Sequence, residues 1–517
     1  MNRILFFFLF SVFLYVSAFA KYNVKVLSKA TTLASQLNEA NTKYIIQEDL
    51  LIDSDVTIPE NCIIQMNGGT ISGPYILRGN NTQIESGMSQ IFGTDIHFAG
   101  TWNISEIYPE WFGAIPNVRT GDCSIGIQKA IEFSCTSSYS KVVKFQGGRY
   151  YCKHAIKLIG GKDYYLQADG NATLVASGRE QKYLLGRDGT NSSDAIGLRL
   201  NIRDVTFDAN YRCDFCVYMP LMSNSTWYNV NCISARLCNY FTNYSFIDNF
   251  YGCKFLSGDP YGYPTKFAIY MGTQACNAML FSGCSFEGAY IGAYSDNGYN
   301  VVFSSCTFEG LRSTGLYVNR TECCSIENCY FEDVSWHRET VDKQSPRFID
   351  PSRLGVTFTK CKRYLNNTSN NGAIDYSMSP FKMHGNIIQN NEVLAIDCDL
   401  QSLTLGFREI SKTNPAGRQS GRMIIVRGNT FQHIKTKGVQ NDCNVFSCGS
   451  ECMQVYDNSF EAIDIIKGMG KLYEDYKPQN IIIANVNGMS TSKSYSSYHN
   501  ANHSEIDDNI VFLNVTE

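Results

Sequence analysis

Acidic side chains recur at regular intervals in the middle of the sequence, and their type suits acid–base chemistry on a substrate. Glu287, Glu309 and Glu332 follow one another at steps of 22 and 23 residues. If each step is one turn of a repeating fold, adjacent carboxyl groups lie about 5 Å apart, as in a retaining glycosidase. Alternate carboxyl groups then have the wider separation of an inverting glycosidase. The alternative is that repetition alone produces a ladder of surface glutamates.

A second candidate set combines one carboxylate with two cations. Asp214, Lys266 and Arg312 each come shortly before an apolar run. In a polysaccharide lyase, a cation neutralises the uronate and a base removes the proton at C5. Lys266 and Arg312 would take these two roles, and Asp214 would bind a metal ion such as Ca²⁺.

A third candidate lies in the segment 335–356, which interrupts the repeat. His337 would act as a general base beneath a sugar stacked on Trp336, and Arg338 would add a binding contact. Long insertions on a regular scaffold often carry function. The alternative is a solvated loop.

The elements that position these groups are indicated by a motif with Cys and Phe two residues apart. After a first step of 31 residues, the motif recurs every 22 or 23 residues. This period is too short for arrays of helical hairpins, and the leucine pattern of leucine-rich repeats is missing. Three short strands and three turns per step predict a parallel β-helix. The copies are Cys253/Phe255, Cys284/Phe286, Cys306/Phe308 and Cys329/Phe331, with weaker ones ending at Phe207, Phe431 and Phe460.

Strand alternation places Cys284 and Phe286 inside the coil and Glu287 outside. The four motif cysteines then form an inward column, about 4.8 Å apart from coil to coil. In-register stacking keeps their Cβ vectors parallel, so we expect mainly reduced thiols. Among the 20 cysteines, the isolated pair Cys213 and Cys216 lacks the second pair that a zinc site needs. We therefore expect these cysteines to form no metal site, with disulfides elsewhere as an alternative.

A second strand follows each motif and carries tyrosines. Tyr218, Tyr270 and Tyr317 occupy the same outward position, with Gly292 at this position in the coil between the last two. An outward aromatic column is a platform for stacking sugar rings. The alternative is that exposed tyrosine merely suits strand propensity.

Composition and the N-terminus indicate the compartment. The 517 residues carry a net charge of -4, and this charge lacks the basic excess that is typical of proteins that bind nucleic acid. Arg3, the apolar run Ile4–Val16 and Ala18-Phe19-Ala20 predict a signal peptide cleaved before Lys21. No later stretch is apolar enough to span a bilayer. The mature protein is expected to be exported, and to be periplasmic, cell-surface or secreted.

Several segments resemble a known family. The stretch Trp111–Ala114, Asp122 and Ile127–Ile131 resemble the entry segment of the pectate lyase superfamily, and Val143–Tyr150 resembles its next strand and glycine turn. The earlier segment Asn67–Ile71, like Ile58–Cys62 before it, resembles exported β-helix proteins of gut Bacteroides-type bacteria. The resemblance covers roughly residues 45 to 465.

This resemblance implies a right-handed parallel β-helix in which a short helix caps the first coil. It also implies action on polysaccharides, by uronate β-elimination or by hydrolysis. The Asp, His and Arg-x-Lys motifs of the hydrolase branch and the Asp cluster of the lyase branch do not stand in their expected places. The choice between these activities, and between catalysis and binding, therefore stays open.

The sequence thus predicts an all-β protein with a signal peptide at 1–20, a β-rich region at 21–107, a β-helix at 108–470 and a capping tail at 471–517. The expected function is cleavage of an acidic or complex polysaccharide by a lyase or glycoside hydrolase. The alternative is a non-catalytic glycan-binding or cell-surface structural protein. The expected partner is a glycan and not nucleic acid. No cofactor is expected, apart from Ca²⁺ in the case of a lyase.

Overall fold

The computed structural model describes residues 22–136, 141–187, 197–258, 265–272, 275–296, 298–311, 314–319 and 325–332, followed by separate strands between residues 372 and 513. The chain divides into two compact units, residues 1–115 with 125–144, and residues 116–124 with 145–517. The predicted signal peptide lies outside the described residues. Within the described ranges, no helix is long and apolar enough to cross a membrane.

The first unit is built on short parallel strands. Its main sheet has the order β1-β2-β5-β7-β4, with β8 paired to β7, and β3 pairs with β6 separately. Inward residues such as Tyr44, Ile64 and Leu77 are buried. The strands are β1 (Asn23–Leu27), β2 (Thr42–Ile46), β3 (Leu50–Leu51), β4 (Val56–Thr57), β5 (Ile63–Met66), β6 (Ile71–Ser72), β7 (Ile76–Glu85), β8 (His97–Trp102), β9 (Glu106–Ile107) and β10 (Val142–Phe145).

Helices in this unit are short. Helix α2 (Leu33–Gln36) begins after Thr32, whose side chain accepts a hydrogen bond from the Ser35 amide. The segment Pro109–Phe112 forms a 3-10 helix, η1. The predicted short helix is confirmed as α3 (Ser124–Ser134). Its Phe133 ring stacks on Phe98 at 4.0 Å and contacts the edge of Trp102, so the helix covers an aromatic cluster.

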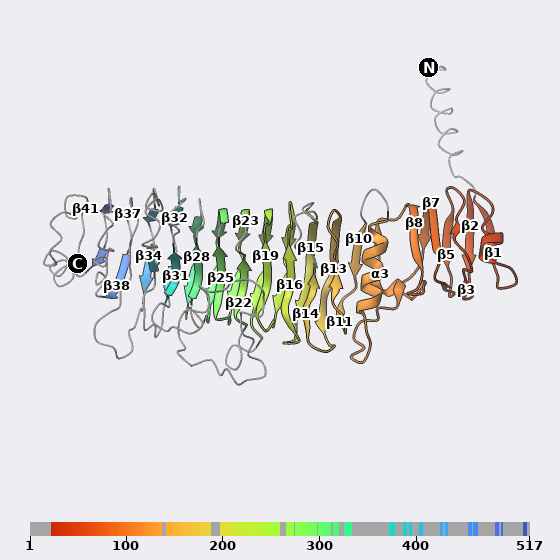
Figure 1. The fold of residues 1–517 in the computed structure, drawn as a ribbon, viewed down its shortest axis with the longest axis horizontal. Helices are drawn as coiled ribbons and strands as arrows, with labels where there is room; N and C mark the ends of the chain where they lie inside the picture. Colours follow the sequence, from red (N-terminus) through yellow and green to blue (C-terminus); the bar gives the residue numbers. More distant parts are fainter. Residues whose placement is uncertain are drawn as a thin grey trace, which may run out of the picture. The chain divides into compact units, whose positions relative to one another are not determined.

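The second unit is the predicted parallel β-helix, an all-β, right-handed coil. Figure 1 shows its strands stacked in chain order. A typical coil contains three strands, and β25, β26 and β27 of one coil pair with β22, β23 and β24 of the coil before. One sheet has nine strands: β12 (Ile156–Lys157), β14 (Gln181–Gly186), β16 (Cys213–Pro220), β19 (Cys238–Asn243), β22 (Phe267–Met271), β25 (Ile291–Asp296), β28 (Thr314–Asn319), β31 (Gly372–Ser377) and β34 (Leu403–Gly406).

The remaining strands form a long second sheet that bends within each coil. In the first part of this unit they are β11 (Gly148–Cys152), β13 (Asp163–Ala176), β15 (Arg199–Asp208), β17 (Thr226–Tyr228), β18 (Asn231–Ile233), β20 (Phe246–Tyr251), β21 (Lys254–Leu256), β23 (Cys276–Ser282), β24 (Ser285–Glu287), β26 (Gly298–Ser304), β27 (Thr307–Glu309), β29 (Ser325–Glu327) and β30 (Tyr330–Glu332).

Parallel strands also continue past residue 470. Strand β39 pairs with β37 and β41, and β40 pairs with β38, so the coil pattern extends into the segment predicted as a capping tail. The later strands of this sheet are β32 (Asn386–Gln389), β33 (Glu392–Leu394), β35 (Ile424–Arg427), β36 (Thr430–Gln432), β37 (Met453–Tyr456), β38 (Ser459–Ile463), β39 (Ile481–Ala484), β40 (Asn487–Met489) and β41 (Ile510–Leu513).

The bend in the long sheet explains which residue types precede the motif cysteines. This residue has a positive φ between 53° and 61° at Gly252, Gly283, Ser305 and Asn328. Left-handed backbone favours Gly and Asn, and these residues hold three of the four positions. A Cβ added to Gly252 or Gly283 would meet open space, so the conformation and not packing favours glycine there.

The inward columns are confirmed. Cys253, Cys284, Cys306 and Cys329 are buried, as are the phenylalanines two residues later. Phe286 stacks on Phe255 at 5.4 Å and on Phe308 at 4.7 Å, with ring planes within 13° of parallel. A neighbouring column brings Phe281 between Phe250 and Phe303. These continuous apolar columns form the core of the second unit.

We expect the column cysteines to titrate as thiols. Cys253, Cys284 and Cys306 are free cysteines, and burial raises the pKa of Cys253 and Cys306. Because the thiolate is the reactive form, the Cys253 and Cys306 thiols should resist oxidation while the coil is folded. Thiol titration of protein unfolded without reductant should detect at least four thiols per chain, with a reduced sample as the control. Almost no free thiol in the unreduced sample would contradict this expectation.

A buried carboxylate, Asp248, interrupts the apolar core. Asp248 takes the register position that Met279 and Val301 occupy on the next two coils, and it is fully buried. Its Oδ1 accepts a hydrogen bond of 3.0 Å from the Ser225 amide, while Oδ2 has no hydrogen-bond partner among the described residues. Burial raises the pKa of Asp248 to about 7, although the Ser225 hydrogen bonds oppose the shift. The core therefore contains an acid that titrates near neutral pH.

Candidate functional site

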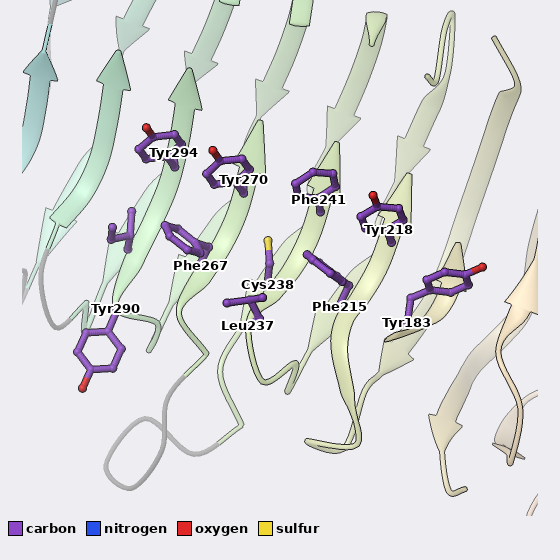
Figure 2. Packing of buried hydrophobic residues seen from close by; sticks show 11 residues of the cluster. Tyr183, Phe215, Tyr218, Leu237, Cys238, Phe241, Phe267, Tyr270, Tyr290 and Tyr294 are labelled. Atoms are coloured by element: carbon purple, nitrogen blue, oxygen red, sulfur yellow. The ribbon is translucent and has the colours of Figure 1, made fainter. Parts of the chain in front are cut away.

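The nine-stranded sheet carries an aromatic stack on one face (Figure 2). The rings of Tyr218, Phe241, Tyr270 and Tyr294 lie on successive strands β16, β19, β22 and β25. Their centroids are 4.8, 5.6 and 4.6 Å apart, and neighbouring planes differ by 8° or less. Tyr240, next to Phe241, instead contacts Trp227 and Phe250 of the inner core. The stack therefore lies on the outer face of the sheet, as predicted.

A glycine lets the stack extend by one ring. Gly186 pairs with Tyr218 in the register, so it holds the stack position on β14. A Cβ at Gly186 would lie 2.6 Å from the Tyr183 ring, which occupies the space above it. Tyr183 thus stacks on Tyr218, with centroids 5.9 Å apart.

The expectation that these tyrosines are exposed is wrong. Tyr218 is 9% exposed and Tyr270 is 1% exposed. Each ring has a neighbouring ring on both faces, so neither face is open to a sugar. The strand register also corrects the predicted alignment of the coils, which placed Gly292 in the tyrosine column. Tyr294, and not Gly292, pairs with Tyr270 and Tyr317. The backbone of Tyr317 continues the column.

An arginine absent from the predicted set neutralises Asp214. The guanidinium of Arg236 contacts the Asp214 carboxylate at 2.7 Å and the Glu180 carboxylate at 2.6 Å. The Arg236 side chain is only 7% exposed, so the pair with Asp214 is shielded from solvent. Asp214 is therefore already bound to a cation within its own chain.

Lys266 lies two coils from Asp214, with Leu237 on the coil between them. Its ammonium lies 4.3 Å from the centroid of the Tyr290 ring, and the residue is buried. Lys182 makes a similar contact with Tyr218 at 3.9 Å but is exposed. Cation–π contacts of this kind hold an ammonium in place. Asp214 and Lys266 therefore each interact with another side chain of this chain, Asp214 with Arg236 and Lys266 with Tyr290.

The glutamate column is confirmed as an in-register feature. Glu287, Glu309 and Glu332 pair on strands β24, β27 and β30. Glu287 is half-buried and accepts a hydrogen bond from the Ser285 hydroxyl, and Glu309 is exposed. Neighbouring coils are about 4.8 Å apart, so the Glu287 and Glu309 carboxyl groups can approach the separation used by retaining glycosidases.

Four predicted site residues lie outside the described residues: Arg312, Trp336, His337 and Arg338. The side chain of Tyr317 also lies outside them. Among the described residues, no group of three or more His, Cys, Asp or Glu side chains is placed to hold a metal ion.

Sequence reasoning missed an exposed aromatic pair on the long sheet. Tyr228 and Tyr251 face each other in the register of β17 and β20, and Arg203 of β15 lies beside them. The tyrosines are 49% and 36% exposed. Their alternation with buried Trp227 and Phe250 was the available signal. The coil of Tyr228 has Val230, and not Cys, at the motif position, and Tyr251 lies on the strand before the motif, where the repeat was not traced.

A cluster around Asp122 is structural. Asp122 accepts hydrogen bonds from the Ser124 and Lys153 amides, the Ser124 hydroxyl and Nδ1 of His154. Burial would raise its pKa, but these hydrogen bonds outweigh burial and lower the pKa. Ser124 and Asp122 approach the same His154 nitrogen, unlike a catalytic triad, which uses both ring nitrogens. The cluster fixes a turn.

No family model and no curated protein matches the chain. Among solved structures, the surface adhesin PfbA of Streptococcus pneumoniae is 11% identical, over 80% of this chain and 93% of that chain, with a TM-score of 0.48. The Dettilon tailspike protein is 11% identical, over 80% and 68%, with a TM-score of 0.45. The A-module of mannuronan C-5 epimerase AlgE4 from Azotobacter vinelandii is 12% identical, over 74% and 96%, with a TM-score of 0.35. All three likenesses are below 25% identity, and the parallel β-helix fold follows from this chain's own strand pairing.

Proposed function

We propose that this chain is an exported, carbohydrate-active β-helix protein that cleaves an acidic polysaccharide by hydrolysis. The observation that carries the proposal is the pairing of Glu287 with Glu309 on adjacent coils. The other described catalytic candidates support it less well, because Asp214 is bound to Arg236 and Lys266 is buried against Tyr290.

In this proposal Glu287 acts as the nucleophile and Glu309 as the general acid. The Ser285 hydroxyl donates to the Glu287 carboxylate and fixes its orientation, as a nucleophile requires. Glu309 is more exposed and lies one coil further along, where it would protonate the departing sugar oxygen. Carboxyl groups about 5 Å apart lead to retention of the anomeric configuration.

The second candidate is a non-catalytic glycan-binding protein. It is favoured by the ion pairs that Arg236 makes with Glu180 and Asp214, which already bind the Asp214 carboxylate within the chain. Exposed tyrosines on the long sheet suit binding without cleavage equally well.

The test is incubation of the purified protein with plant, host and microbial polysaccharides, measuring reducing ends and the absorbance of unsaturated uronates. We expect new reducing ends without that absorbance. Glu287→Gln and Glu309→Gln should each lower the rate about 100-fold or more, since a positioned acid or base contributes at least this factor. Glu327→Gln, on the neighbouring strand β29, is the matched control and should keep full activity.

Each other outcome has a distinct meaning. Unsaturated products would replace hydrolysis with lyase chemistry and direct attention to Lys266 and a bound Ca²⁺. Binding without any product would establish the non-catalytic alternative. Full activity of both glutamine variants would place the catalytic groups elsewhere.

A further inference from the structure

Three exposed side chains form a strip along the coils of the second unit. Arg203 of β15 pairs with Tyr228 of β17, and Tyr228 pairs with Tyr251 of β20. Their inward neighbours Ile202, Trp227 and Phe250 are buried, so the strip residues point away from the core. Successive strip residues are therefore about 4.8 Å apart along the helix axis.

The strip combines a cation with aromatic rings. The Arg203 guanidinium lies 4.9 Å from the centroid of the Tyr228 ring. Stacking on a ring restricts a guanidinium while its N–H groups remain able to donate to a carboxylate or sulfate. Exposed Lys254 lies three residues after Tyr251, beyond the bend at Gly252. The surface thus offers ring edges and faces for stacking and two cations for anionic groups.

Polar side chains lie at this bend and just beyond it on the preceding coils. The Asn231 amide donates to the Thr206 hydroxyl at 2.9 Å, and the Asn229 amide donates to Asp204 at 2.8 Å. These contacts place two amides, one hydroxyl and the Asp204 carboxylate beside the aromatic strip. Sugars present both apolar ring faces and hydroxyl groups, so rings beside these polar groups match their chemistry.

The strip also lies on the same sheet as the glutamate pair. Glu287 pairs with Leu256, which is five residues after Tyr251 on the coil before. Five strand residues span at most about 17 Å, so a bound chain of a few sugars would reach from Tyr251 to Glu287.

We propose that Arg203, Tyr228 and Tyr251 form a binding subsite for a glycan that contains uronates, with the tyrosines stacking on sugar rings and Arg203 binding a uronate carboxylate. This inference rests on the proposed function and deepens it, because it assigns a substrate-positioning surface to the long sheet. A protein partner is the other occupant such a surface would suit, and the test below separates the two.

The experiment measures affinity of the intact chain by gel-retardation and calorimetry with three polysaccharide probes: polygalacturonate, alginate and neutral dextran. We expect wild-type protein to bind at least one uronate polymer and to bind dextran more weakly. Tyr228→Ala combined with Tyr251→Ala should lower affinity about ten-fold, from the usual strength of ring stacking. Arg203→Gln should narrow the preference for the uronate polymer over dextran.

Two controls test position and charge. Tyr299→Ala removes a similarly exposed ring from β26, and Arg199→Gln removes an exposed arginine that pairs with Asp163. Both controls should bind like wild type. Circular dichroism and melting temperature verify that every variant is folded.

The outcomes distinguish the subsite from the function. Wild-type binding that persists unchanged in the double tyrosine variant would overturn the subsite and leave the proposed function standing. Loss of binding in Tyr299→Ala as well would also overturn it, because the effect would not be local. Failure of wild-type protein to bind any of the three probes would overturn the subsite as an acidic-glycan site and favour a protein partner. Cleavage of another glycan in the polysaccharide screen would still preserve the proposed function in that case.

Discussion

The Asp248→Asn variant is expected to be more stable than the wild type above neutral pH, by as much as about 4 kcal/mol. Asp248 is fully buried at a position where the following coils have Met279 and Val301. Charging a carboxylate there costs free energy that an uncharged amide of the same shape avoids. The amide oxygen can still accept the Ser225 hydrogen bond.

The raised pKa of Asp248 determines the direction in which stability changes with pH. Burial lifts the pKa of folded Asp248 to about 7 from an ordinary value near 3.8. The protonated form favours folding, so this contribution is fully present below about pH 4 and is lost as the pH rises towards 7. Two neighbouring titratable groups, Tyr240 and Cys276, have their pKa values raised by burial and stay neutral in this window.

The measurement is thermal and denaturant unfolding of both proteins between pH 4 and pH 8.5. The stability difference should grow with pH and level off above about pH 8. Asp163→Asn is the matched control, because Asp163 is exposed beside Arg199. A difference between wild type and Asp248→Asn that does not change with pH would contradict the prediction.

The Phe286→Ala variant is expected to lose about 3–5 kcal/mol of stability. Phe286 is fully buried, lies between Phe255 and Phe308, and meets Phe281 and Phe303 edge-on at 6.1 Å. Removing its ring leaves a cavity that rigid neighbouring coils cannot fill. In a coil-by-coil fold each coil depends mainly on its neighbours, so the defect should be local.

Hydrogen exchange combined with urea unfolding, both at pH 6, checks this expectation. Amides of β21, β24 and β27 should lose protection first in Phe286→Ala. Tyr251→Ala removes a ring from the outer surface of a neighbouring coil and should change stability by less than about 0.5 kcal/mol. Equal losses in the two variants would mean that the phenylalanine column is not a principal source of stability.

The inner columns were predictable because one motif encodes them. Cys and Phe recur at a coil's length, and strand alternation then assigns both to the inside, as Cys284 and Phe286 show. The coil with Val230 and Cys232 was not recognised from the sequence, because it has other residues at the two motif positions. Both residues are nevertheless buried. Pattern matching follows residue identity, whereas the core requires only apolar volume.

The outer face was predicted less well, because alternation says which way a side chain points and not what covers it. Tyr218 and Tyr270 point outward and are nevertheless buried in a ring stack. Arg236 pairs with Asp214 from the next coil, a contact that depends on three-dimensional register. The register at Tyr294 was missed because the connection before β25 shifts the alignment by two residues.

The coils keep their register although one connection differs greatly in length from the next. Ten residues separate β21 from β22, and three separate β24 from β25. Phe255 and Phe286 nevertheless stack, and Ile269 pairs with Ala293. This corner can thus gain or lose residues during evolution without altering the pairing of the strands around it. The length of this corner can therefore vary while the scaffold, and the sequence motif that builds it, remain fixed.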